Sequence, residues 1–203
     1  MPEITTLFFD VGGVFLTNGW GHESRAKAAT HFSYDYESVE RRHQPLFEEF
    51  DCGSLSLDEY LDQVIFFEER AFSKEDFIQF MKQQSQPYES SLDVLQRLAS
   101  TGRYLLFTIN NESFALNQYR IQSFGLDQYF TAFLSSCYLG VIKPNRKIFQ
   151  KALWITQRKG EECLFIDDRE ENVTAAQACG IRGIHLKDHH QLSDLLKEEG
   201  IKL

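Results

Sequence analysis

The chain has 203 residues, a length that suits one domain of ordinary size or a core domain with a large insertion. Hydrophobic residues make up 42% and charged residues 25%, a globular balance that excludes disordered and fibrous classes. The formal net charge of −9 argues against a nucleic-acid partner, because phosphate backbones are bound by clustered Lys and Arg. A small phosphate ester remains compatible, since one local site can be positive on an acidic protein.

Nothing in the sequence predicts export or membrane insertion. The N-terminus lacks a basic leading region, and Asp10 interrupts its apolar stretch, so we expect no signal peptide. No run of 18 apolar residues is present, so we expect no membrane span. The four cysteines are far apart and form no CxxC pair, which argues against a zinc site. We therefore expect a reducing compartment and a cytoplasmic location.

Five short apolar runs predict buried β-strands. The first is Thr6–Phe9, which ends at Asp10 and a Gly-Gly turn, and the others cover residues 104–109, 132–134, 163–166 and 183–186. Helical patterns separate them at residues 91–100, 113–124, 147–156, 172–179 and 191–198. Strands alternating with helices predict an α/β fold with a Rossmann-like, doubly wound parallel sheet.

A stretch between the first two strands has a different character. It has no strand-like run, and helical patterns cover residues 23–32, 36–50, 57–70 and 74–84. We predict an all-helical insertion at residues 19–88 and a core made of residues 1–18 and 89–203.

Polar residues follow three of the predicted strands. They are Asp10, the pair Asn110-Asn111 and the pair Asp167-Asp168, and Lys143 follows another strand. Sites in open α/β sheets form at the carboxyl ends of strands, so these side chains are expected to converge. A carboxylate can attack phosphorus and form an aspartyl phosphate. Clustered carboxylates repel one another unless a hard cation such as Mg²⁺ lies among them.

Four segments resemble the motifs of the haloacid dehalogenase superfamily, in the family's order. They are FDVGGV at residues 9–14, LFTINNES at 106–113, GVIKPNRKIF at 140–149 and FIDDREENV at 165–173. The resemblance covers about residues 7–186 and implies a Rossmann-like core with a helical cap, as in subfamily I. The helical insertion matches the family's cap, which closes over the site and selects substrate.

The resemblance implies specific roles at the strand ends. Asp10 becomes the nucleophile, Lys143 the lysine of the third motif, and Asn110 the phosphate contact, with Asn111 beside it. Asp168 becomes a direct Mg²⁺ ligand, and Asp167 a ligand or a carboxylate that orients metal-bound water.

The turn after the nucleophile supplies the remaining contacts. The backbone carbonyl of Gly12 is expected to complete the metal site, and the turn that includes Gly13 to offer N–H groups to phosphate. Phosphatases of this family usually carry an aspartate at the Gly12 position, where it protonates the leaving oxygen. General acid–base help of this kind is worth roughly 10²–10⁴-fold in rate.

Three explanations for Gly12 remain open. The substrate could have a good leaving group, as in a sugar 1-phosphate or an acyl phosphate. A cap residue or water could substitute, and His22 is the nearest candidate in sequence; Trp20 and His22 are both expected to line the pocket. Activity could also be weak or lost.

The sequence therefore predicts a Mg²⁺-dependent phosphomonoester hydrolase for a small phosphorylated metabolite, such as a sugar phosphate. Two alternatives stay open: a 2-haloacid dehalogenase, whose leaving halide needs no proton, and a catalytically impaired binding protein of the same fold. The paired Asp167 and Asp168 favour a metal site over a metal-free dehalogenase site. The sequence predicts neither the substrate nor the oligomeric state.

Overall fold

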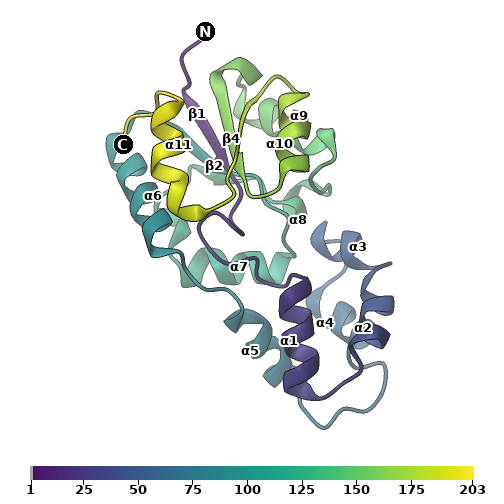
Figure 1. Cartoon of the computed structure of the whole chain (residues 1–203). Helices are drawn as coiled ribbons and strands as arrows, with labels where there is room; N and C mark the ends of the chain where they lie inside the picture. The colour runs from purple at the N-terminus through teal and green to yellow at the C-terminus, as the bar shows by residue number, and fades with distance from the viewer. Residues whose placement is uncertain (1) are drawn as a thin grey trace.

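The computed structural model describes residues 2–203. Its centre is a parallel sheet with the strand order β3-β2-β1-β4-β5 (Figure 1). The strands are β1 (Thr6–Phe9), β2 (Leu105–Thr108), β3 (Ala132–Phe133), β4 (Cys163–Asp167) and β5 (Arg182–His185). Every neighbouring pair is parallel. The predicted Rossmann-like α/β fold is confirmed.

Helices cover both faces of the sheet. Leu7 and Phe9 pack in one apolar cluster with α6 (Glu89–Thr101) and α11 (Leu192–Glu198), whereas Phe8 packs in a second cluster with α9 (Arg146–Thr156) and α10 (Glu170–Gln177). Both faces of β1 are therefore buried, which explains its uninterrupted apolar sequence. The remaining core helices are α7 (Phe114–Ser123) and α8 (Ser136–Leu139), with short 3₁₀ turns at Leu126–Gln128, Gly160–Glu162 and His189–Gln191.

Five helices form a separate body after β1, the cap (Figure 1). They are α1 (His22–Phe32), α2 (Tyr36–His43), α3 (Phe47–Asp51), α4 (Leu57–Val64) and α5 (Lys74–Gln83). The cap has its own apolar core, to which α7 adds Leu116. Capping boxes begin α4 at Ser56 and α5 at Ser73, so the sequence itself fixes these helix starts.

Two cap helices are shorter than the sequence predicts. The helix expected at residues 36–50 is two helices, α2 and α3, which are separated at Pro45. Proline has no N–H to donate and disfavours helical geometry in the residue before it. The helix expected at residues 57–70 ends at Val64, and Arg70 Nε donates to the carbonyl of Ile65 at 2.7 Å just beyond that end.

The two chain crossings between core and cap lie side by side. Leu16 forms a bridge with Pro87, and Thr17 N donates to the carbonyl of Gln86 at 2.9 Å. Thr17 Oγ1 also donates to the carbonyl of Gln84 at 2.6 Å. Entry and exit of the cap are therefore held together. Among residues 2–203, no helix combines the length and the apolar character that crossing a membrane requires.

Candidate active site

The ends of β1 and β4 bring the predicted acidic residues together. Phe9 pairs with Ile166, so Asp10 and Asp167 leave neighbouring strands side by side. Carboxylate oxygens of Asp10, Asp167 and Asp168 lie within 4.8 Å of one another. Lys143 Nζ lies 3.0 Å from Asp10 Oδ2 and 2.6 Å from Asp167 Oδ2. The carboxylates and the lysine therefore converge at one edge of the sheet.

The charges of this cluster do not balance without a cation. Burial, followed by the neighbouring Asp167 and Asp168, raises the pKa of Asp10 to about 7, although Lys143 opposes the shift. Burial disfavours the charged form of Lys143, but Asp10 and Asp167 outweigh it and raise the pKa of the ammonium. Three buried or half-buried carboxylates face one ammonium group, and a divalent cation would relieve their repulsion. The all-oxygen donor set fits Mg²⁺.

Asp167 and Asp168 have different surroundings. Asp167 is fully buried; its Oδ1 accepts from Arg169 N at 2.8 Å and from Asn172 Nδ2 at 3.0 Å, and its Oδ2 contacts Lys143. Asp168 is half-buried, and its carboxylate accepts one hydrogen bond, from Asn18 Nδ2 at 3.3 Å. Asp168 thus has free acceptor capacity, whereas the lone pairs of Asp167 are largely taken.

Gly13 has no side chain, and this leaves space for the Asp168 carboxylate. Its φ is +71°, and a Cβ there would lie 2.3 Å from Asp168 Oδ2, so only glycine leaves room for that carboxylate. The expectation that Gly13 donates to phosphate needs correction. Its N–H already donates to the carbonyl of Leu16 at 2.7 Å within the turn.

The space beside Gly12 is bordered by other polar groups. A Cβ at Gly12 would lie 2.8 Å from Asn18 Oδ1 and 3.8 Å from Arg120 Nη1. The neighbourhood in which related enzymes place a second carboxyl therefore holds an amide and a guanidinium. No group that could donate and accept a proton at neutral pH lies in these contacts.

Two asparagines after β2 have separate partners. Asn110 is buried; its Nδ2 donates to Asn117 Oδ1 at 3.1 Å, and its Oδ1 accepts from Ser135 Oγ at 2.8 Å. One amide hydrogen of Asn110 remains for a ligand. The position of Asn111 does not favour the substrate contact that the sequence predicts. Its amide bonds the backbone N and O of Lys143, at 2.8 and 3.0 Å, and so braces the lysine segment.

Trp20 and His22 both contact aromatic residues of the cap. The indole of Trp20 is 8% exposed, donates to Tyr60 Oη at 3.1 Å and packs edge-on against Phe77, so it belongs to the cap core. His22 is exposed at the first position of α1, where its ring meets Tyr36 edge-on. These contacts favour a role for the indole in the cap core over the pocket-lining role that the sequence predicts.

Sequence reasoning missed a buried ion pair next to the turn. Glu112 Oε2 lies 2.8 Å from Arg120 Nη1, and both side chains are buried. Arg120 Nη2 also donates to the carbonyl of Thr17 at 2.6 Å. Glu112 lies in the loop before α7 and Arg120 within it, a separation for which no sequence pattern predicts a contact.

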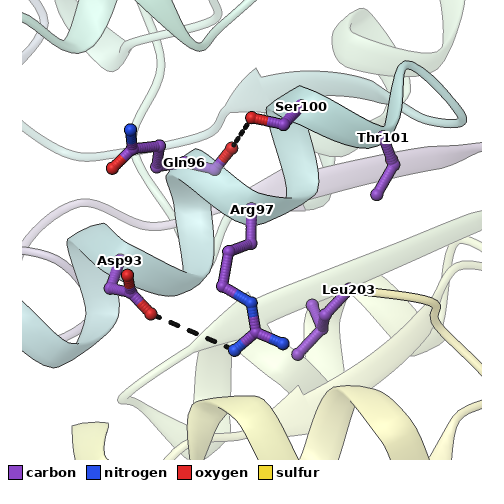
Figure 2. A pocket seen from close by; sticks show the side chains of 6 residues that line it. All are labelled: Asp93, Gln96, Arg97, Ser100, Thr101 and Leu203. Atoms are coloured by element: carbon purple, nitrogen blue, oxygen red, sulfur yellow. Dashed lines mark hydrogen bonds and ion pairs between the residues drawn. The ribbon is translucent and has the colours of Figure 1, made fainter.

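Other candidate features lie away from this cluster. An open hollow on α6 is lined by Asp93, Gln96, Arg97, Ser100, Thr101 and Leu203 (Figure 2). It lies toward the end of α6 that leads into β2, at the opposite edge of the sheet from Asp10. Asp188, His189 and His190 also place ligand atoms within 4.8 Å of one another. These are chain neighbours at the surface, and His189 stacks on Tyr88 at 3.8 Å.

A parallel α/β sheet that gathers a lysine and three carboxylates at its carboxyl edge, beneath a helical cap, defines a class of cap-bearing hydrolases. The family model for haloacid dehalogenase-like hydrolases matches residues 4–180. The chain belongs to the haloacid dehalogenase-like hydrolase family.

Comparisons with individual proteins add detail. A sesquiterpene phosphatase, AstK of Aspergillus oryzae, is 37% identical over 59 residues, which cover 29% of this chain and 30% of that protein. The chain therefore aligns with under a third of the length of this relative.

Several solved structures share the fold. A haloacid dehalogenase family enzyme from Bacteroides thetaiotaomicron, in complex with magnesium and inorganic phosphate, has a TM-score of 0.81 at 21% identity, covering 95% of this chain and 99% of that one. A family member from Porphyromonas gingivalis has a TM-score of 0.77 at 21% identity, covering 99% and 100%. An L-2-haloacid dehalogenase has a TM-score of 0.64 at 17% identity, covering 89% and 83%.

Proposed function

We propose that this chain is a Mg²⁺-dependent phosphomonoester hydrolase that forms an aspartyl phosphate on Asp10. The observation that carries the proposal is the contact of Asp10 Oδ2 with Lys143 Nζ at 3.0 Å, with Asp168 within ligand reach. A lysine beside the attacking carboxylate can neutralise the transferring phosphoryl group, and charge neutralisation with positioning supplies most of the catalysis in such reactions. The phosphatase relative, and the magnesium and phosphate bound by the Bacteroides enzyme, support this assignment.

Each residue of the site has a separate role in the proposed reaction. Asp10 Oδ1 accepts the N–H of Val11 at 2.7 Å, which holds the carboxylate in place. Asp10, Asp168 and the carbonyl of Gly12 would hold Mg²⁺, which supplies charge neutralisation when bound. Asp167 would keep Lys143 aimed at the phosphoryl oxygens, and the free amide hydrogen of Asn110 would donate to one of them.

The substrate we propose is a small phosphorylated metabolite. The cap stands over the carboxyl edge of the sheet, and α3 contacts α8 beside that edge (Figure 1). A cap in this position limits the size of the group attached to phosphate and excludes water during transfer.

Phosphate release from a panel of small esters with Mg²⁺ tests the assignment. We expect turnover by the natural chain, loss of turnover with EDTA, and no turnover above background for Asp10→Asn. Asp127→Asn, at an exposed carboxylate outside the site, serves as the matched control and keeps full activity. Equal turnover by Asp10→Asn and the natural chain would show that Asp10 is not the nucleophile.

The dehalogenase alternative rests on Gly12, since halide leaves without a proton. A 2-haloacid dehalogenase would release halide and ignore EDTA. The alternative of a binding protein without activity would hold Mg²⁺ and inorganic phosphate but release no product from any ester. The same panel, extended with 2-haloacids and a phosphate-binding measurement, separates these outcomes from the proposed phosphatase.

A further inference from the structure

Asp51, the last residue of α3, lies where the cap meets the core. Ser136 Oγ donates to the carbonyl of Asp51 at 2.6 Å and accepts the N–H of Glu112 at 3.0 Å. Ser136 N donates in turn to the carbonyl of Asn110 at 2.9 Å. A single core residue therefore joins the backbone of Asp51 to the segment that leaves β2 beside the nucleophile.

Charged groups that act on the Asp51 carboxyl belong to segments that follow the strands of the sheet. They include Glu112, which follows β2, and Arg169, which follows β4. β2 and β4 flank β1 on its two sides, and Asp10 directly follows β1. Because β2 pairs with β1, the hydrogen bonds through Ser136 hold Asp51 beside the segment that adjoins the end of β1 and Asp10.

The Asp51 carboxyl has the properties of an acid that retains its proton. Burial, followed by the charge of Glu112, raises its pKa to about 7, while Arg25 and Arg169 oppose the shift. Glu112 is itself paired with Arg120, so it gives Asp51 no counter-charge. Cys52, Tyr60 and Cys137 also interact with the Asp51 carboxyl. Within residues 2–203, the carboxyl of Asp51 accepts no hydrogen bond and joins no ion pair.

We propose that Asp51 is the general acid and base of this enzyme and performs from the cap the task for which Gly12 has no side chain. The inference rests on the proposed phosphatase function. It explains why the loss of a carboxyl at position 12 is compatible with hydrolysis, because a carboxyl from a different segment reaches the same substrate atom.

The two half-reactions balance with this single group. In the first, Asp10 Oδ forms a bond to phosphorus while the ester P–O bond breaks, and the Asp51 proton passes to the leaving oxygen. The products are an alcohol, the aspartyl phosphate and the Asp51 carboxylate. In the second, that carboxylate takes a proton from water as the water oxygen attacks phosphorus. This step releases phosphate and restores both Asp10 and protonated Asp51.

A leaving-group series separates acid catalysis from a structural role. The natural chain, Asp51→Asn and the control Glu49→Gln, an exposed carboxylate on the same helix, are assayed with Mg²⁺ on alkyl and aryl phosphates. We expect Asp51→Asn to lower kcat/KM for alkyl phosphates by roughly 10²–10⁴-fold and for 4-nitrophenyl phosphate by less than about threefold, because nitrophenolate needs no proton. Glu49→Gln should match the natural chain on every ester.

A second readout follows the intermediate. Without its base, Asp51→Asn should release one equivalent of nitrophenol in a rapid burst and accumulate the aspartyl phosphate. The fall of kcat/KM for alkyl phosphates above about pH 7 should also disappear in this variant. Equal losses on alkyl and aryl esters, or no loss on alkyl esters, would overturn the role of Asp51 alone. Absence of phosphate release by the natural chain would instead reject the phosphatase function and this inference with it.

Discussion

Gly13 is a residue at which the backbone of the turn and the Asp168 carboxylate constrain one another. Its positive φ favours glycine, and its lack of Cβ lets the Asp168 carboxylate approach the turn. Gly102 has a similar φ of +59°, but no atom lies within 4 Å of a Cβ built there. An alanine at Gly102 would therefore strain only the backbone, whereas an alanine at Gly13 would also displace the Asp168 carboxylate.

Gly13→Ala should lower the affinity for Mg²⁺ by roughly 10–100-fold, as expected when the group that orients a metal ligand is disturbed. Gly102→Ala should cost only about 1–2 kcal/mol of backbone strain and keep normal affinity. Mg²⁺ titrations of phosphate release, with calorimetry in parallel, measure the difference. Matching Mg²⁺ affinities for the two variants would show that Gly13 does not shape the metal site.

The sequence predicts which side chains converge where their position follows from a strand end. Asp10, Asp167 and Asp168 directly follow β1 and β4 or end them, so strand pairing alone brings them together. For Trp20, chain proximity to the first turn does not tell into which core a side chain points. Asp51 escaped prediction because its place depends on how the cap rests on the core.

Helix α7 shows how one element connects the core to the cap linker. Arg120 on this helix pairs with buried Glu112 and donates to the carbonyl of Thr17, while Leu116 packs into the cap core. Periodicity predicted the helix but not these contacts, since the ion pair joins the helix to the loop before it and the other two contacts reach segments far away in sequence. The break in the cap at Pro45 was missed for a different reason: the apolar spacing continues past the proline.

Arg120→Met should destabilise the fold by about 3–5 kcal/mol at neutral pH, because it leaves the Glu112 carboxylate buried without a partner. Burial raises the pKa of Glu112 and Arg120 opposes it, so the variant should raise that pKa further. The stability loss should therefore shrink at acidic pH, where Glu112 takes up a proton. Urea unfolding at pH 5 and pH 8 checks this, and the double variant Glu112→Gln/Arg120→Met should recover part of the loss. A penalty that does not change with pH would contradict this explanation.

At the scale of the whole molecule, the cap is an independently packed body with a buried polar chain. The hydroxyl of Tyr60 accepts from Trp20 Nε1 and shares a hydrogen bond with His43 Nδ1 at 2.8 Å. Burial, with a contribution from Arg25, lowers the pKa of His43 from 6.5 to about 4, although Glu40 opposes the shift. The cap therefore tolerates acid less well than an exposed histidine would suggest.

The contribution of His43 to stability should be complete above about pH 6.5 and should fall as the pH decreases toward about 4, because the unfolded chain binds the proton more readily. The loss is of the order of 3 kcal/mol. Melting temperatures between pH 7 and pH 4 should fall less steeply for His43→Gln than for the natural chain. His31→Gln, at an exposed position on α1, should keep the natural slope. Parallel curves for all three proteins would show that His43 does not cause the acid sensitivity.

The bridge between Leu16 and Pro87, with the hydrogen bonds of Thr17 to Gln84 and Gln86, brings the two ends of the cap segment to neighbouring points on the core. A segment whose two ends lie close together can be replaced by another segment of this kind without distorting the domain into which it is inserted. Chimeras that graft the helical bodies of other family members between these two residues should retain Asp10, Lys143, Asp167 and Asp168 of this core. Such grafts would change which molecules gain access to an unchanged catalytic centre, and a graft without a counterpart of Asp51 would also lose the proposed proton donor.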